Sequence, residues 1–289
     1  MSCGALAREA VLEATVEGGR APRTFRLLRC PQCGLVMTSP RLGRLELEEF
    51  YRPEYWGRVN ADDPAWVRRD QAPRTSFLER FRQRGRILDV GCGLGLFLLA
   101  LDPARWDRYG IEVMPAAYRE AQRRLGADRI ITEDLSDFTR GAPFDVITFW
   151  DVLEHVPDPA AALRQAARLL KPGGLVLVRA PNFASYLARR YGADWYALSL
   201  PYHLFHFTPA TLTGMLEAAG FKFRALGNPA GAENYHAFKH TLLNRLTRLH
   251  GPRGGRRRYY LVKPALRAWE YVSTRRGGGS SFEVCAERL

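Results

Sequence analysis

The sequence contains no uncharged apolar run that approaches the roughly 20 residues needed to span a membrane as a helix. Its first ten residues include Arg8 and Glu9 and lack an apolar core, so no secretory signal is predicted there. Cysteine is scarce and odd in number, with five in 289 residues, which argues for a reducing compartment. These absences predict a cytoplasmic protein.

Acidic residues are also few relative to basic ones. The chain has 30 Asp and Glu against 43 Lys and Arg, a formal net charge of +13. This excess favours an anionic partner such as nucleic acid, a phospholipid surface or a phosphorylated substrate, although a simple arginine-rich bias remains an alternative. Hydrophobic residues make up 46% of the chain, enough for a globular core. The length allows one large domain with additions, or two small ones.

The most informative stretch joins an apolar run at 87–90 to a second apolar run at 94–101. Between and within them stand three alternating glycines: Gly91, Gly93 and Gly95. A strand, a glycine turn and a helix start allow the backbone to approach a ligand closely. The spacing departs from the dinucleotide pattern, because Leu96 stands where its third glycine would be. Asp89 suits a cationic or amine-bearing ligand better than a pyrophosphate.

The pattern Asp-x-Gly-x-Gly-x-Gly resembles motif I of the class I S-adenosylmethionine-dependent methyltransferases. The resemblance implies that Asp89 helps to hold the amine of the cofactor and that the turn, including Cys92, passes beneath it. Glu112, at the end of the next predicted strand, can accept the ribose hydroxyl protons. The remaining expected cofactor contacts are Val113, Asp134, Leu135 and Trp150, with Glu133 as the alternative to Asp134.

Strand and helix patterns alternate after the glycine turn, which predicts a parallel, doubly wound sheet. Strands are expected at 106–111, 129–132, 144–149, 175–179, 221–226 and 282–286, and helices at 64–84, 115–125, 158–170 and 209–219. The expected fold class is α/β, a Rossmann-like seven-stranded sheet, parallel with the last strand antiparallel. A small N-terminal zinc-ribbon-like module and a helical basic insertion are added to it. The expected domains are 1–56, 65–226 with 281–289, and 227–280.

Histidines supply the candidate catalytic groups. His155 lies in a segment, Asp151 to Asp158, that resembles the region after the fourth strand of the same superfamily. A neutral imidazole can take a proton from an acceptor hydroxyl, although a structural His155 is an equal alternative. Glu154 could orient His155 or cap the next helix. His203 and His206 precede a late helix and are further candidates to face the acceptor; a metal site there is disfavoured because no acid pair is near.

The N-terminal region carries a two-cysteine knuckle, Cys30-Pro31-Gln32-Cys33-Gly34, whose spacing suits zinc. Only Cys3 lies upstream, so the expected ligand set is incomplete. Two explanations are open: a native chain with another cysteine before Met1, or a module that folds without metal. The region also resembles the zinc-ribbon leader of a subgroup of bacterial methyltransferases that act on sugars, glycans or secondary metabolites.

An insertion at 227–280 holds eleven Lys and Arg against Glu233 and Glu270. It carries two helical apolar stripes, the first at Phe238, Leu242, Leu246 and Leu249 and the second at Val262, Leu266 and Trp269. Basic amphipathic helices suit an anionic membrane surface, and equally suit RNA phosphates. A helical cover with a solvated basic face is the third reading.

Together these features predict an enzyme that transfers a methyl group from S-adenosylmethionine to a hydroxyl of a small molecule, a sugar or a lipid-linked acceptor. An RNA methyltransferase and a non-catalytic cofactor-binding protein remain alternatives. The expected location is cytoplasmic, peripheral on the inner face of the membrane. The sequence leaves the acceptor and the oligomeric state unknown.

Overall fold

The computed structural model describes residues 8–17, 21–43, 46–47, 50, 60–229, 232–275 and 279–289, with the backbone alone at 232–234 and 262–275. The chain forms two compact units. The large-sheet unit comprises Arg52–Arg179, Thr213–Gly227 and Val284–Leu289. The small-sheet unit comprises Met1–Tyr51, Ala180–Leu212 and Asn228–Glu283.

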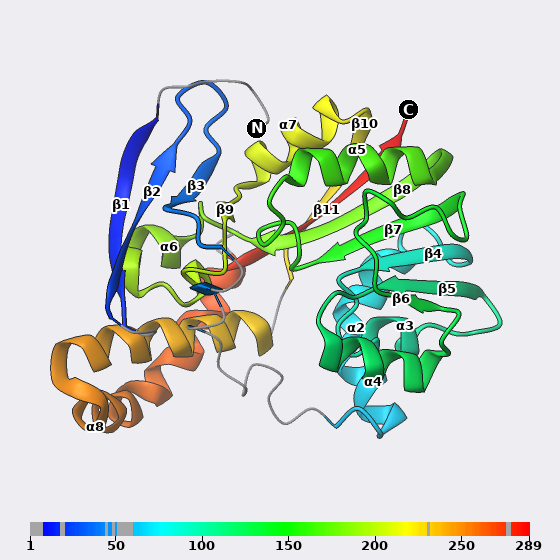
Figure 1. Ribbon diagram of the computed structural model, residues 1–289. Coiled ribbons are helices and arrows are strands. Elements are labelled where there is room, and N and C mark those ends of the chain that lie inside the picture. The colour runs from blue at the N-terminus through cyan, green and yellow to red at the C-terminus, as the bar shows by residue number, and fades with distance from the viewer. Residues whose placement is uncertain are drawn as a thin grey trace. The chain divides into compact units, whose positions relative to one another are not determined.

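The large sheet has seven strands in the order β10-β11-β8-β7-β4-β5-β6 (Figure 1). The bounds of its strands are β4 Gly85–Val90, β5 Trp106–Ile111, β6 Ile130–Ile131, β7 Phe144–Trp150, β8 Leu170–Pro181, β10 Phe221–Gly227 and β11 Ser281–Arg288. Strands β6, β5, β4, β7 and β8 pair in parallel, and the late strand β11 runs antiparallel to them. The predicted fold class is therefore confirmed.

The helices of this fold begin within two residues of the predicted starts, whereas α2 ends at Glu79, five residues before its predicted end. Their bounds are α2 Pro64–Glu79, α3 Leu96–Ala100, α4 Pro115–Leu125, α5 Pro159–Leu169 and α7 Pro209–Ala218. Helix α5 is capped by Asp158, whose carboxylate accepts from the Ala161 amide at 2.9 Å. Helix α7 begins after Thr208, whose hydroxyl accepts from the Thr211 amide at 3.2 Å. At both helix starts the polar cap is followed by proline, which suits the first helical position.

Two details of the sheet differ from prediction. The third strand is only Ile130–Ile131, because Arg129 and Thr132 lie outside the two-residue pairing with β5. The segment 171–174, between the predicted helix 158–170 and the predicted strand 175–179, belongs to the extended start of β8, where the register with β7 shifts. Lys171 is held there by an ion pair with Asp145 at 2.9 Å.

The core of the large-sheet unit is apolar and continuous. It is formed by side chains of the strands and of α2, α3 and α4, among them Phe77, Leu78, Ile87, Phe97, Leu98, Trp106, Ala121, Val146 and Leu177. Helix α2 packs against α3. This packing fixes the helix that follows the glycine turn.

The small-sheet unit is built on an antiparallel sheet in the order β1-β2-β3-β9. Its strands are β1 Glu9–Val16, β2 Arg23–Arg29, β3 Val36–Ser39 and β9 Phe205–His206. Strand β9 was not predicted; it consists of two residues, and only its pairing with Val36 and Met37 defines it. The leader is therefore part of a larger antiparallel structure that includes a segment distant in sequence.

Helices complete this unit: α6 Tyr186–Tyr191, the short 3-10 turns η2 Gly192–Asp194 and η3 Tyr196–Leu198, and α8 Ala232–Arg275. Gly251, at φ 70° and ψ 170°, breaks α8 into two helical segments. The insertion is thus helical, as predicted. Its first stripe enters a shared core through Phe238, together with Ala14, Leu27, Val36, Leu187, Trp195, Leu198 and Ala237. Among the described residues, no helix combines the length and the apolar character that a membrane span requires.

Candidate active site

The glycine turn takes the shape that the sequence required. Gly91, Gly93 and Gly95 all have positive φ, at 69°, 56° and 76°. A Cβ at Gly91 would lie 2.6 Å from Cγ2 of Val152, and one at Gly95 would lie 2.6 Å from Cδ1 of Leu125. Only glycine fits this turn without strain, because positive φ and close packing coincide.

Asp89 lies in β4, next to the turn, and its side chain is 3% exposed. It accepts a hydrogen bond from the Thr148 hydroxyl of β7 at 2.7 Å. Burial raises the pKa of Asp89 to about 7, against the opposing effects of the Thr148 bond and the Arg74 charge. A cationic ligand beside Asp89 would favour the ionised form of this carboxyl group, so the position suits such a ligand.

Glu112 follows β5 and is 5% exposed. One carboxylate oxygen accepts from the Gly93 amide at 2.8 Å, and the other accepts from the Met114 amide at 2.7 Å. The side chain therefore ties the glycine turn to the end of β5, a role that sequence reasoning missed. Each oxygen keeps a further lone pair with which it could accept a ligand hydroxyl.

The other predicted cofactor contacts lie at the same edge of the sheet, because parallel strands end together. Asp134 is exposed, and its carboxylate accepts from the Ser136 amide at 2.9 Å. Leu135 and Cys92 are buried, whereas Val113 is 65% exposed. The Trp150 ring meets Phe97 edge-on at 5.2 Å. Its buried indole N–H has no hydrogen-bond acceptor among the described residues, so it is available to a ligand.

A group of charged residues follows β7. Asp151 has a left-handed backbone, φ 58°, and its carboxylate binds Arg74 of α2 at 3.0 Å and lies 3.4 Å from Arg179 of β8. No local pattern indicated these partners, which are far apart along the chain. Half-buried His155 follows in a turn, with its amide bonded to the Val152 carbonyl at 2.9 Å.

Glu154 is the most deeply buried acid of this group, at 1% exposure. Neither of its carboxylate oxygens has a hydrogen-bond partner among the residues that the structure describes. Burial and the neighbouring Asp151 charge raise its pKa well above the usual range, against the effect of Arg179. This shift favours the protonated form of Glu154, in which the carboxyl group could donate a hydrogen bond.

His203 and His206 belong to the small-sheet unit and are both buried. The Thr38 hydroxyl donates to the His203 carbonyl at 2.7 Å, so its oxygen accepts from Nε2 of His206 at 3.0 Å. Nδ1 of His203 donates to the Ala197 carbonyl at 2.9 Å. Burial lowers the pKa of His206 to about 3. These hydrogen bonds hold both imidazole rings in place within the unit. The catalytic role of His203 and His206 remains a prediction.

Cys30 and Cys33 flank a tight turn in which the Gly34 amide donates to the Cys30 carbonyl at 2.9 Å. Cys30 is buried and Cys33 is half-buried. The third expected ligand, Cys3, lies outside the described residues. The described part of the leader thus offers two thiols, whereas structural zinc takes four ligands. The zinc site remains a prediction.

The fold and the acid-lined edge together define a class I methyltransferase architecture, for which S-adenosylmethionine is the methyl donor. Residues 65–226 match a family described as a methyltransferase domain. This match covers more than half of the chain, and the chain therefore belongs to that family.

Curated relatives with similar sequences are ubiquinone biosynthesis O-methyltransferases. The one from Alkalilimnicola ehrlichii is 38% identical over 125 residues, 40% of this chain and 50% of that protein. The one from Thiobacillus denitrificans is 33% identical over 153 residues, 49% of this chain and 66% of that protein. The chain thus spans about half to two thirds of the length of these relatives.

Solved structures support the fold. A SAM-dependent methyltransferase from Thermotoga maritima aligns over 77% of this chain and 92% of its own, with a TM-score of 0.50 and 18% identity. An S-adenosylmethionine-dependent methyltransferase from Mesorhizobium loti aligns over 76% of this chain and 99% of its own, with a TM-score of 0.50 and 19% identity.

Proposed function

We propose that the protein methylates a hydroxyl group of a small-molecule, sugar or lipid-linked acceptor, in glycan or secondary-metabolite biosynthesis, with S-adenosylmethionine as donor. The observation that carries the proposal is a set of buried acids at the edge of the sheet that bears the glycine turn, namely Asp89, Glu112 and Glu154. His155 directly follows Glu154 in the sequence. The names of the curated relatives add support for oxygen as the methylated atom, since they are O-methyltransferases.

The cofactor fits the residues at this edge. Asp89 would bind its amine, the backbone of Gly91 to Gly95 would pass beneath it, and Glu112 would accept from its ribose hydroxyls. Asp134, Leu135 and Val113 would surround the adenine, and the Trp150 indole N–H would supply a further donor. When bound, the cofactor supplies an electrophilic methyl group on a positively charged sulfur.

The chain's own contribution to transfer is alignment and proton removal. His155 is half-buried and so reachable by an acceptor. Its imidazole would take the proton of the acceptor hydroxyl as that oxygen is methylated. Glu154 directly precedes His155, and the Arg74–Asp151–Arg179 group holds this segment in place. Correct alignment alone supplies a large part of such a displacement.

The test is transfer of labelled methyl from S-adenosylmethionine into a lysate of the source organism, followed by fractionation. Label in the organic-extractable or glycan fraction supports the proposal, and a His155→Gln variant should then lose roughly 10²-fold or more in rate at unchanged cofactor affinity. Label confined to RNA would refute it. Tight cofactor binding without label in any fraction would favour a non-catalytic protein.

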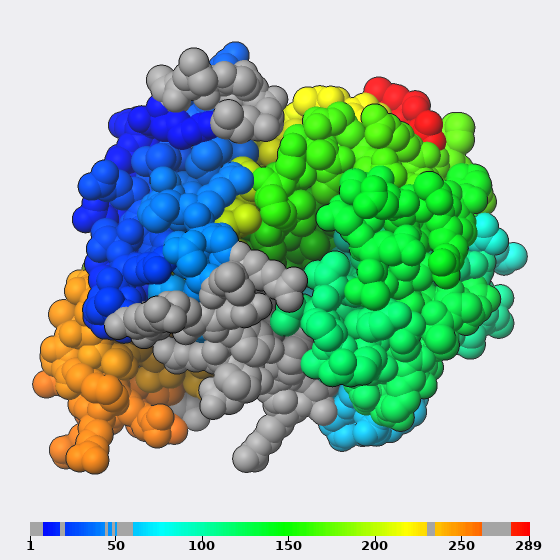
Figure 2. All heavy atoms as spheres, viewed as in Figure 1, coloured from blue at the N-terminus to red at the C-terminus, as the bar shows by residue number. Residues whose placement is uncertain are grey.

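The insertion helix bears on where the acceptor comes from. Leu249, Tyr260 and Leu261 are 52%, 62% and 76% exposed, and exposed arginines stand beside them on α8, at Arg253, Arg256, Arg257 and Arg258. Figure 2 shows this part of α8 in orange at the molecular surface. Apolar and aromatic side chains next to arginines suit the headgroup region of an anionic membrane. We propose that α8 makes this contact, which would place the protein on the inner face of the membrane.

Not all of the predicted basic residues serve this surface. Arg245 and Arg248 are ion-paired with Asp194 at 3.1 and 2.7 Å, so they hold the helix in its own unit. Co-sedimentation with vesicles tests the assignment: binding to vesicles with anionic lipid, but not to neutral ones, should be lost in the Tyr260→Ser, Leu261→Ser double variant. Retained binding in that variant, or preferential binding to RNA, would contradict it.

The resemblance of the leader to zinc-ribbon leaders also enters the proposal. If zinc is bound, Cys30 and Cys33 would be two of its ligands, with Cys3 as a third. Metal analysis of the purified chain and of the Cys30→Ser, Cys33→Ser double variant tests this. A stoichiometric metal that survives the double substitution would exclude these ligands.

A further inference from the structure

The large-sheet unit has a cavity at the edge opposite the glycine turn. It has a volume of about 580 Å³ and is lined by Arg84, Gly85, Pro103, Ala104, Arg105, Trp106, Asp107, Arg108, Leu125 and Arg129. Gly85 and Trp106 begin β4 and β5, whereas the candidate cofactor site lies where these strands end. Strands of six residues separate the two sites by about 17 Å.

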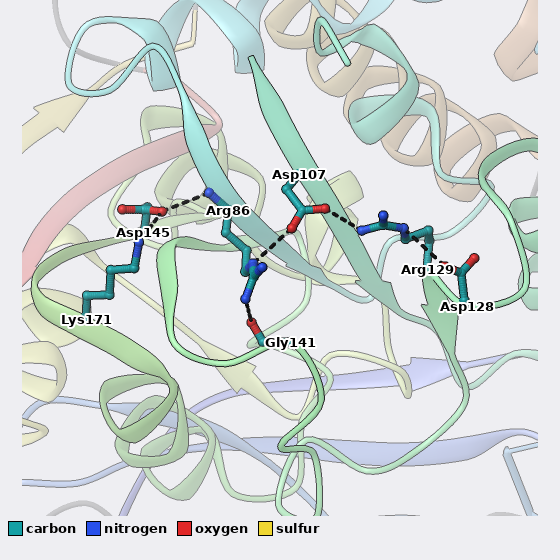
Figure 3. Close-up of polar contacts among 7 residues, drawn as sticks. All are labelled: Arg86, Asp107, Asp128, Arg129, Gly141, Asp145 and Lys171. Carbon is teal, nitrogen blue, oxygen red and sulfur yellow. Dashed lines mark hydrogen bonds and ion pairs between the residues drawn. The ribbon is translucent and has the colours of Figure 1, made fainter. Parts of the chain in front are cut away.

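The lining of this cavity is strongly basic, with four arginines against one aspartate. The aspartate is already neutralised. Figure 3 shows Asp107 between Arg86 and Arg129, with Nε of Arg86 at 2.9 Å and an ion pair to Arg129 on its other oxygen. The neighbouring acid of this edge, Asp145, is likewise shared by Lys171 and Arg82 at 2.9 and 3.4 Å.

Among the described residues, acids match the remaining three arginines less well. Arg84 is exposed and has no ion pair among the described residues. Arg105 has only a loose contact with Asp102 at 3.7 Å, and both side chains are more than half exposed. Arg108 donates to the Leu98 and Leu101 carbonyls at 3.0 and 3.2 Å, which are neutral groups. Burial and the charge of Arg129 lower the pKa of Arg108, against the opposing charge of Asp102.

We propose that this cavity binds a small organic phosphate, with Arg84 and Arg105 holding the phosphate and Pro103, Ala104 and Leu125 contacting the body of the ligand. Guanidinium groups bind phosphate oxygens in pairs, so several arginines around one cavity favour phosphate over a single carboxylate. The volume falls in the range of small-molecule sites. A concave site that combines arginines with the apolar Pro103, Ala104 and Leu125 suits a compact ligand better than an extended RNA backbone. The site is independent of the methyl-transfer site.

Calorimetry tests the proposal, with uridine diphosphate and pyrophosphate as probes in about 150 mM salt. S-adenosylhomocysteine is kept in excess so that no probe enters the candidate cofactor site. The expected result is one site per chain. Its affinity falls at least about tenfold, or 1.4 kcal/mol, in the Arg84→Ala, Arg105→Ala double variant. The matched control is Arg164→Ala, an exposed arginine of α5 outside the cavity lining, which should change the affinity less than about twofold.

Each outcome decides the matter. Tighter binding of uridine diphosphate than of pyrophosphate supports an organic phosphate, and equal binding would overturn the assignment of Pro103, Ala104 and Leu125 to the body of the ligand. No binding at millimolar probe, or an equal loss in the Arg164→Ala control, would overturn the proposal. A single-stranded RNA that binds more tightly than either probe and is displaced by neither would also overturn it, and would assign the arginines to a nucleic-acid surface. Circular dichroism of each variant establishes that the fold is kept.

Discussion

Asp194 should be the main polar anchor of the insertion helix. Its side chain is 6% exposed and accepts from Nε of Arg248 at 2.7 Å, from a terminal nitrogen of Arg248 at 2.7 Å, and from Arg245 at 3.1 Å. Burial raises the pKa of Asp194, but the bonds from Arg248 and Arg245 outweigh it and hold the pKa below its usual value. The perturbation is Asp194→Asn, which keeps the shape and removes the charge.

The size of the effect follows from the exposure of the partners. Breaking a fully buried pair costs about 3–5 kcal/mol, and breaking an exposed pair costs about 0–1 kcal/mol. Arg245 and Arg248 are 40% and 54% exposed and can return to water, whereas the amide that replaces the Asp194 carboxylate would stay buried. We therefore expect a loss of about 2 kcal/mol, which lowers the melting temperature by about 4–8 °C.

Hydrogen exchange is the sharper assay, because the chain has two compact units and need not unfold in one step. Amides of residues 236–250 should exchange about 30-fold faster in Asp194→Asn, which is 2 kcal/mol in the opening equilibrium. The control is Glu13→Gln, which removes a pair with Arg26 in which both side chains are at least 60% exposed. Equal protection in the Asp194→Asn variant and the control would refute the reasoning.

The same pair has a defined pH window. Because the folded pKa of Asp194 lies below the unfolded value near 3.8, its contribution is present above pH 3.8 and is lost as pH falls through the folded pKa. Wild type and Asp194→Asn should therefore converge in stability only in strong acid. Convergence already at pH 5 to 6 would show that another group is responsible.

Three further predictions concern the candidate active site. Because burial raises the pKa of Asp89 to about 7 in the free protein, binding of S-adenosylmethionine should release a proton, and its affinity should increase as the pH rises from 6 to 8. Calorimetry in buffers of different ionisation heat measures both effects, and Asp89→Asn should abolish them. Gly91→Ala should destabilise the protein by about 1–3 kcal/mol in urea unfolding, with only part restored by adding Val152→Ala, because the positive φ remains. Glu112→Gln should weaken cofactor binding at least about tenfold, since its amide cannot accept from both the Gly93 and Met114 amides.

The central sheet could be predicted because its strands are buried and carry their own end signals. β5 and α4 have the predicted bounds, and β4 and β7 differ from prediction by a residue or two. An apolar run that ends in glycine or an acid needs no distant partner to be recognised. β9 has no such signal, since two residues become a strand only through pairing with β3.

Site residues that directly follow the end of a strand could be predicted from the sequence. Contacts between residues that are far apart in the sequence could not. Asp89 and Glu112 stand beside the glycine turn by chain order alone. The Arg74–Asp151 pair joins residues 77 positions apart, and the use of Glu112 to hold the Gly93 amide follows from backbone geometry. Arg245 and Arg248 were likewise predicted to belong to the basic face of the insertion, but they form ion pairs with Asp194. No local sequence pattern indicates these pairs.

A net positive charge disfavours a cationic cofactor, and the two edges of the large sheet resolve this conflict. At the carboxyl edge stand Asp89, Glu112, Asp134, Asp151 and Glu154, all within or directly after β4 to β7. At the amino edge stand the arginines of the cavity. Since interactions beyond about 8–10 Å are screened at physiological salt, each edge presents its own sign to a ligand. Raising the salt should therefore weaken S-adenosylmethionine and organic-phosphate binding alike. If the net charge of the whole protein determined the effect, the positive protein would repel the cationic cofactor, and added salt would instead strengthen cofactor binding.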